Sequence, residues 1–208
     1  MDQAEWQSFV TEAEIVVVTR FSFLGESGFK SQFSQTPEML FDADRLKLRL
    51  MLFETLTLAS LAGQSDRNFH LFVLCSDEMP RWARKRLKML CAAALPAGNY
   101  TVAPLPRGPA PLHLRRFLVR RCKGRPAFHT VLDDDDGLSS DFIARLRSKM
   151  AGLPPLPDAQ GAEEPLRFIS FAQGYALLLR DLADARLKLF KHRYPFINLG
   201  LAMVGPAR

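Results

Sequence analysis

Cysteine is scarce in this sequence, with three residues among 208, at positions 75, 91 and 122. They are far apart and match no metal-binding spacing, so we expect reduced thiols in a reducing compartment rather than a disulfide framework or a zinc site. Long apolar runs are also lacking. The longest, at residues 50–62, is interrupted by Glu54 and is too short to span a bilayer. The acidic residues before residue 15 argue against a signal peptide. We therefore expect a cytoplasmic protein.

Aromatic residues with a polar group are few, with three tyrosines and two tryptophans against sixteen phenylalanines. This bias indicates an apolar core with few aromatic hydrogen-bonding groups. A composition of 48% hydrophobic and 24% charged residues is that of an ordinary globular protein. The net charge of +6 is compatible with a phosphate-bearing ligand, a nucleic acid or an anionic membrane, and selects none of them.

Apolar runs alternate with amphipathic segments in the first 150 residues. Four apolar or β-branched runs predict strands, at residues 14–21, 68–75, 100–105 and 126–132. Apolar residues at helical spacing predict a helix after each strand, at residues 42–61, 80–94, 109–123 and 139–150. This alternation predicts right-handed βαβ units and an α/β fold, with a Rossmann-type, mostly parallel sheet flanked by helices.

The pattern changes after a proline-rich break at residues 152–165. Short strands are predicted at 166–171 and 175–179, joined by Gln173 and Gly174, with a charged segment at 180–193 and a strand-like run at 196–204. We expect a single domain over residues 1–208, in which residues 14–150 form one half and residues 165–208 a mixed second half.

Four consecutive aspartates, Asp133 to Asp136, directly follow the fourth predicted strand. At about 5 Å and an effective dielectric of about 20, each close pair of carboxylates repels by roughly 3 kcal/mol. A divalent cation such as Mg²⁺ or Mn²⁺ would relieve this repulsion, and the carboxyl end of a parallel strand is where α/β sheets hold ligands. An acidic surface loop is the alternative. Ser139, Ser140 and Asp141 are expected to cap the helix that follows.

A D-x-D motif after the fourth strand of a βαβ half, followed by a mixed half, is the layout of GT-A-type glycosyltransferases. Four segments extend the similarity: Arg20-Phe21-Ser22, residues 52–58, residues 64–69, and residues 132–138 with Asp141-Phe142. Together they resemble the bacterial rhamnosyltransferase family, from about residue 15 to the C-terminus. The resemblance implies a GT-A-like fold and a nucleotide-diphosphate sugar donor, with residues 14–150 as the nucleotide-sugar-binding half and residues 165–208 as the acceptor half. It also implies a divalent metal, Mn²⁺ or Mg²⁺, and transfer of a hexosyl group to a saccharide or lipid-linked acceptor hydroxyl.

The resemblance also implies roles for individual residues. Asp133 and Asp135 are the D-x-D carboxylates in one register, and Asp134 and Asp136 in the other. In the first register the metal ligands are Asp133, Asp135 and Asp136, and Asp133 and Asp134 also contact the donor. The end of the first strand, Thr19-Arg20-Phe21, would lie beside the nucleotide base.

Basic residues just ahead of the acidic strand, Arg120, Arg121 and Arg125, are candidates to stabilise the charge of the diphosphate. A solvated basic helix face is the alternative for each of them. Asp181 and Asp184 are candidate catalytic bases. His192 is a candidate metal ligand or base, or a surface histidine. A late histidine often completes the metal site in this layout, and none follows residues 198–200, so an incomplete second half is one interpretation.

Two other function classes remain open from the sequence. Asp134 to Gly137 resembles the D-x-D-G-T motif of haloacid-dehalogenase phosphatases, with Asp134 as nucleophile and Asp136 as general acid/base. Leu138 stands where that motif has threonine or valine, and the motif normally follows a first strand. Alternatively, basic helices at residues 81–88 and 115–125 could bind nucleic acid, although no recognition motif is present and we expect no such partner. The same helices could rest on an anionic membrane that holds a lipid-linked acceptor.

Overall fold

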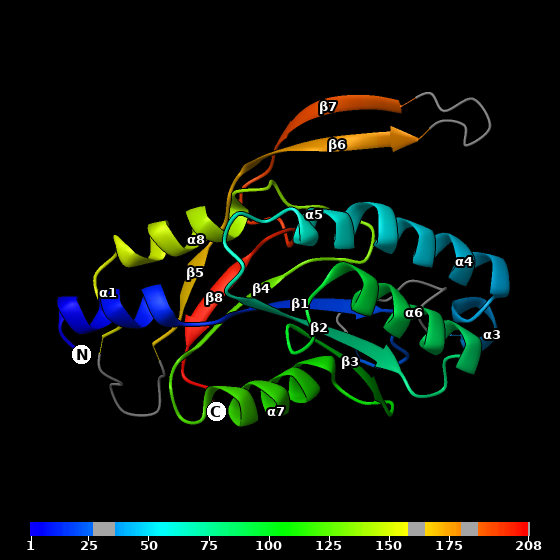
Figure 1. Ribbon diagram of the computed structural model, residues 1–208, viewed down its shortest axis with the longest axis horizontal. Helices are drawn as coiled ribbons and strands as arrows, with labels where there is room; N and C mark the ends of the chain where they lie inside the picture. Colours follow the sequence, from blue (N-terminus) through cyan, green and yellow to red (C-terminus); the bar gives the residue numbers. More distant parts are fainter. Residues whose placement is uncertain (27–35, 158–164, 180–186, 208) are drawn as a thin grey trace.

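The computed structural model of the chain describes residues 1–26, 36–157, 165–179 and 187–207. Its centre is a six-stranded sheet with strand order β3-β2-β1-β4-β8-β5 (Figure 1). The four strands that alternate with helices are mutually parallel: β1 (Ile15–Phe21), β2 (Phe69–Ser76), β3 (Tyr100–Leu105) and β4 (Ala127–Val131). β8 (Ala202–Gly205) is antiparallel to β4, and β5 (Arg167–Ile169) is antiparallel to β8. The predicted mostly parallel sheet is therefore confirmed.

Helices cover both faces of this sheet. One face carries the larger core and is covered by α1 (Gln3–Glu12), α4 (Ala43–Leu52), α6 (Arg81–Ala94) and α8 (Phe142–Ala151). The other face packs against α7 (Ala110–Cys122), through residues such as Leu118 and Phe117 (Figure 1). Because residues along a strand point alternately to the two faces, Val17 belongs to the first core and Val16 and Val18 to the second.

The helix predicted at residues 42–61 contains a wider turn. It starts as α4, whose cap Asp42 accepts a hydrogen bond from the backbone N–H of Arg45 at 2.8 Å. It continues as a π-helical segment, η1 (Phe53–Leu58), and ends as α5 (Ala59–Ala62). Such π-bulges insert an extra residue per turn and are frequent at functional sites. Here the segment carries Thr57, which is fully buried and contacts the acidic loop.

Two strand predictions in the second half are wrong. Gln173 and Gly174 do not form a turn but lie within β6 (Gln173–Leu179), which pairs with β7 (Leu187–Arg193) in a separate two-stranded sheet that projects from the body (Figure 1). The charged segment at 180–193 thus contains a strand that its composition did not indicate. Of the run predicted at 196–204, only residues 202–204 lie in a strand, because Phe196 and Gly200 adopt positive φ angles of 57° and 69°. At Gly200 a Cβ atom would lie 2.8 Å from the Phe142 ring, so this turn requires glycine.

The two halves of the sequence share one sheet, since β5 and β8 continue the sheet beyond β4. Their assignment to donor and acceptor stays a prediction. Among the described residues, no helix is long and apolar enough to span a membrane.

Candidate functional site

The four aspartates lie at the carboxyl edge of the sheet, in the loop that joins β4 to α8. The backbone N–H of Leu132 still donates to Val18 of β1 at 3.0 Å, and the N–H of Asp136 donates back to the carbonyl of Asp133 at 3.2 Å. The loop therefore turns immediately after the sheet ends. β1 and β4 are adjacent and parallel, so the acidic loop lies beside the end of β1.

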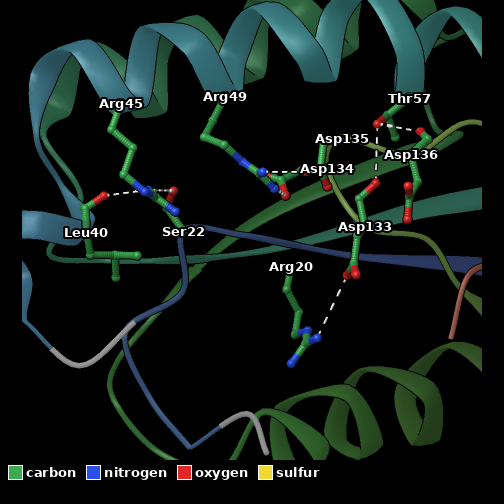
Figure 2. A network of polar contacts seen from close by, with 10 residues as sticks. All are labelled: Arg20, Ser22, Leu40, Arg45, Arg49, Thr57, Asp133, Asp134, Asp135 and Asp136. Atoms are coloured by element: carbon green, nitrogen blue, oxygen red, sulfur yellow. Dashed lines mark hydrogen bonds and ion pairs between the residues drawn. The ribbon is translucent and has the colours of Figure 1, made fainter. Parts of the chain in front are cut away.

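Arg49, on α4, neutralises two of the four carboxylates (Figure 2). Its Nε donates to Oδ2 of Asp134 at 3.1 Å, its Nη2 donates to Oδ1 of Asp134, and its Nη1 donates to Oδ2 of Asp135 at 2.7 Å. The Asp134 residue is only 3% exposed. Burial raises the pKa of Asp134, and the hydrogen bonds from Arg49 act in the opposite direction. Burial lowers the pKa of Arg49, but the two aspartates outweigh this effect and raise it.

Two side chains, Thr57 of η1 and Gln64 just after α5, hold the backbone of the loop. The hydroxyl of Thr57 lies 2.9 Å from the carbonyl of Asp136 and 3.3 Å from that of Asp133. Gln64 donates from Nε2 to the carbonyl of Ser139 at 2.7 Å and accepts the backbone N–H of Ile143 at 3.0 Å. Gln64 thus caps α8, whereas Asp141, at the N-cap position, makes no side-chain cap bond. The prediction that Ser139, Ser140 or Asp141 caps this helix is wrong, because a distant amide occupies the first free N–H group.

The side chains of Asp133 and Asp136 point away from the helix that carries Arg49 and Thr57 (Figure 2). Asp133 has an exposed side-chain fraction of 42% and lies 3.8 Å from Nη2 of Arg20 at the end of β1. Burial, followed by the charges of Asp135 and Asp133, raises the pKa of Asp136 to about 6. The loop therefore presents the carboxylates of Asp133 and Asp136 on the side that faces away from α4. The surroundings of Asp136 disfavour its ionised form.

Of the three residues at the end of β1 predicted to lie beside a nucleotide base, one reaches the acidic loop and two are buried. Arg20 reaches Asp133, as described above. Thr19 is fully buried, and its hydroxyl has no hydrogen-bond partner among the described residues. Phe21 is also fully buried and packs edge-on against Phe53 at a ring separation of 5.7 Å. Phe21 therefore belongs to the core and offers no exposed face to a nucleotide base.

Arg45, one helical turn before Arg49, organises the segment that follows β1. Its Nη1 donates to the carbonyl of Leu40 at 2.7 Å and to the hydroxyl of Ser22 at 3.1 Å (Figure 2). Ser22 has a φ angle of 44°, and its hydroxyl is held by this bond. Sequence reasoning missed both arginines. The available signal was their position four residues apart, on the flank of the apolar stripe formed by Leu46 and Leu50.

The structure does not bring Arg120 and Arg125 to the acidic loop. α7 runs back across the sheet, so its last turn and Arg125 lie at the amino end of β4, whereas the aspartates lie at its carboxyl end. Eight residues of nearly extended chain separate Arg125 from Asp133, which corresponds to roughly 25 Å. Arg121 instead pairs with Glu14 at the amino end of β1. Arg120 and Arg125 are therefore too far from the acidic loop to bind a donor there.

Other predicted site residues lie elsewhere. Asp181 and Asp184 fall outside the described residues. His192 lies on β7 with its ring stacked on that of Tyr194 at 6.0 Å. Across the described ranges, no group of three or more His, Cys, Asp or Glu side chains is arranged to hold a metal ion. The three predicted metal ligands, Asp133, Asp135 and Asp136, therefore do not form such a group, and Asp135 pairs with Arg49.

Comparison with known proteins gives one match. The sequence model of a family described as putative rhamnosyl transferase matches residues 14–208. No curated protein and no solved structure matches the chain.

Proposed function

We propose that this chain, which belongs to the putative rhamnosyl transferase family, is a metal-dependent glycosyltransferase with a GT-A-like architecture. Family membership supports a transferase that takes a sugar from a donor to an acceptor. The finer proposal is that the donor is a nucleoside diphosphate sugar held at the carboxyl edge of the sheet. The acceptor hydroxyl would belong to a saccharide or to a lipid-linked sugar.

The proposal rests on the different contacts that the four aspartates make. Asp134 and Asp135 are neutralised by Arg49 and attach the loop to α4. Asp133 and Asp136 point away from α4, at the edge where parallel sheets place their ligands (Figure 2). Two of the four carboxylates therefore attach the loop to α4, and the other two are not engaged by Arg49.

The residues present fit a divalent cation of the Mg²⁺ or Mn²⁺ class. Such ions bind through one or two carboxylates together with substrate phosphates and water. Asp133 and Asp136 supply the two carboxylates, and the raised pKa of Asp136 indicates that a nearby positive charge would favour its ionised form. When bound, the cation would act as a Lewis acid that neutralises the diphosphate leaving group.

The chain's own residues have distinct tasks in this proposal. Arg20 adds a positive charge beside Asp133 and would attract the donor's phosphates. Thr19, next to it on β1, is fully buried, so its unsatisfied hydroxyl does not face the donor. Thr57 and Gln64 hold the loop backbone, so that the carboxylates need not reorganise when donor binds. The base that deprotonates the acceptor is not assigned among the described residues.

The two alternative functions lose support from the geometry. A phosphatase nucleophile must be exposed to its substrate, but both oxygens of Asp134 accept hydrogen bonds from Arg49 and the residue is buried. The basic helices α6 and α7 cover opposite faces of the sheet, so they do not form one continuous surface for nucleic acid or membrane.

The test is donor turnover. The protein is incubated with a panel of UDP-, dTDP- and GDP-sugars, with Mn²⁺ or with chelator, and released nucleoside diphosphate is quantified by mass spectrometry. We expect slow, metal-dependent release from one donor, lost in Asp133→Asn and Asp136→Asn and retained in Asp44→Asn, an exposed aspartate on α4. Metal-independent release, or equal release by all variants, would contradict the proposal.

A further inference from the structure

A second charged feature lies away from the acidic loop, where α6 packs against the edge strand β3. A cavity of about 350 Å³ opens there, with Cys75 and Pro104 on the strand side. Its helix side consists of four cationic residues of α6, Arg81, Arg84, Lys85 and Lys88. Their spacing of three and four residues places them on one face of the helix. No carboxylate lines the cavity.

These four cations have no partners within the described residues: none makes an ion pair or a side-chain hydrogen bond. Arg86, on the same helix but outside the cavity, pairs with Glu54 at 3.1 Å. Arg84 differs from an ordinary surface arginine because its Nε is buried and lacks a hydrogen-bond acceptor. Leaving a buried hydrogen-bond donor unsatisfied costs about 1–3 kcal/mol. Such groups are rare in native proteins, so the unsatisfied Nε of Arg84 indicates a missing acceptor.

The cavity lining is positively charged, and Asp77, whose negative charge acts on Cys75, is not part of that lining. The first turn of α6 contains no acidic residue, although helix N-termini usually favour one. The thiol of Cys75 is fully buried, and burial raises its pKa to about 12, so it contributes no negative charge at neutral pH. Like charges gathered around a cavity repel one another, and an anion bound among them would remove that repulsion.

This cavity is separate from the acidic loop. The strand order β3-β2-β1-β4 places two strands between β3 and β4, which at about 4.8 Å per strand puts the two strands roughly 14 Å apart. The acidic loop also repels phosphate unless a metal is bound, whereas the cavity needs no metal. Occupancy of the two sites can therefore be measured independently.

We propose that the cavity between α6 and β3 binds a multiply charged phosphate group, and that this second site is distinct from the donor site. Arginine and lysine together suit phosphate, because guanidinium groups donate in a fork and ammonium groups add point charges. The phosphate could come from a soluble phosphate ester or from the headgroup of an anionic lipid. Binding there does not depend on the glycosyltransferase proposal.

The test uses inorganic pyrophosphate as the probe, titrated calorimetrically into the protein at low salt with EDTA present. EDTA removes divalent metal, so pyrophosphate has no favourable site at the acidic loop. We expect saturable binding to the wild-type chain and affinity about tenfold or more weaker in Arg84→Met/Lys88→Gln, because two charge-assisted contacts are lost. Lys85→Gln/Lys88→Gln changes only exposed side chains and should show the same direction of effect, which guards against a folding defect in the first variant.

The matched control is Arg115→Gln/Arg116→Gln, which removes two exposed cations from α7, on the other face of the sheet. It should bind pyrophosphate as the wild type does. Equal weakening in control and cavity variants, or no binding to the wild type, would overturn the proposal. Co-sedimentation with phosphatidylcholine vesicles, with and without phosphatidic acid, identifies the source of the phosphate. Vesicle binding that requires phosphatidic acid and is lost only in the cavity variants indicates a lipid headgroup. Pyrophosphate binding without such vesicle binding indicates a soluble ligand.

Discussion

Arg49 and Asp134, 85 residues apart in the chain, form a two-point ion pair in which Nε and Nη2 of the guanidinium donate to the two carboxylate oxygens. This pair joins α4 to the loop after β4, and it keeps the carboxylate of Asp134 buried against α4. The same guanidinium reaches Asp135 with its Nη1. One residue of a distant helix thus holds two members of the acidic run and leaves Asp133 and Asp136 unpaired with it.

Replacing Arg49 should destabilise the fold strongly. In Arg49→Met the carboxylate of Asp134 stays buried without its counter-charge, and breaking a buried pair in this way costs about 3–5 kcal/mol. Chemical denaturation at neutral pH measures the change in the free energy of unfolding. The control is Lys47→Met on the same helix, whose fully exposed pair with Asp44 should contribute little to stability.

The double variant Arg49→Met/Asp134→Leu completes this cycle. It removes both charges, and it should recover much of the stability lost in the single variant. If Arg49→Met lowers the free energy of unfolding no more than Lys47→Met does, the pair of Arg49 and Asp134 does not hold the loop to α4.

Removing the hydroxyl of Thr57 should loosen the acidic loop without disturbing the core. Thr57→Val keeps the shape of the side chain but leaves the carbonyls of Asp133 and Asp136 without this donor, at a cost of about 1–2 kcal/mol. Amide hydrogen exchange in residues 132–138 should accelerate more than in β1. Thr55→Val is the control, since Thr55 is exposed and bonds only to its own helix. Equal exchange rates in the two variants would contradict the role of Thr57.

Asp136 should make both stability and metal binding depend on pH. Its folded pKa of about 6 lies above its ordinary value of 3.8. Its favourable contribution to folding is therefore complete below pH 3.8 and is lost as the pH rises through about 6. Bound metal requires the ionised form, so Mn²⁺ affinity in the presence of a nucleoside diphosphate should fall as the pH drops below about 6. Asp136→Asn should be more stable than the wild type at pH 7.5 and should bind Mn²⁺ weakly at every pH. A wild-type Mn²⁺ affinity that does not change between pH 5 and 7.5 would count against Asp136 as a titrating metal ligand.

His129 should act in the opposite direction over the same range. It is 6% exposed, and burial lowers its pKa from 6.5 to about 4. The unfolded chain binds a proton at pH 5 that the folded chain does not, so the contribution of His129 to stability is complete above pH 6.5 and declines toward pH 4. The full difference corresponds to about 3 kcal/mol. His129→Leu should flatten this decline in denaturation curves at pH 4.5, 5.5 and 7; an unchanged slope would show that His129 is not the responsible group.

The alternation of apolar strands and amphipathic helices predicted most of the parallel sheet from local sequence. β2 and β4 are buried along nearly their whole length, and each coincides with an apolar run that predicts a buried strand. Asp133 to Asp136 were correctly located at the end of β4 because a strand end can be recognised from the chain alone. The identity of the sheet edge then follows from parallel topology.

Long-range pairing was not predictable in the same way. Arg49 and Gln64 act on residues 75 or more positions away, and no local pattern announces such contacts. Arg120 and Arg125 are near the aspartates in sequence, but the whole length of β4 lies between them. Closeness along the chain therefore did not mean closeness in space. β7 was missed because its exposed lysines and arginine resemble a charged loop, while its pairing with β6 supplies the strand geometry.

The most direct test of the donor site is calorimetric titration of UDP, dTDP and GDP, each with and without Mn²⁺, into the wild type, Asp133→Asn, Asp136→Asn and Asp44→Asn. We expect that one nucleotide binds only with Mn²⁺, that both loop variants lose this binding, and that Asp44→Asn keeps it. Nucleotide binding that is independent of Mn²⁺, or that survives in both loop variants, would contradict a metal-assisted donor site at Asp133 and Asp136.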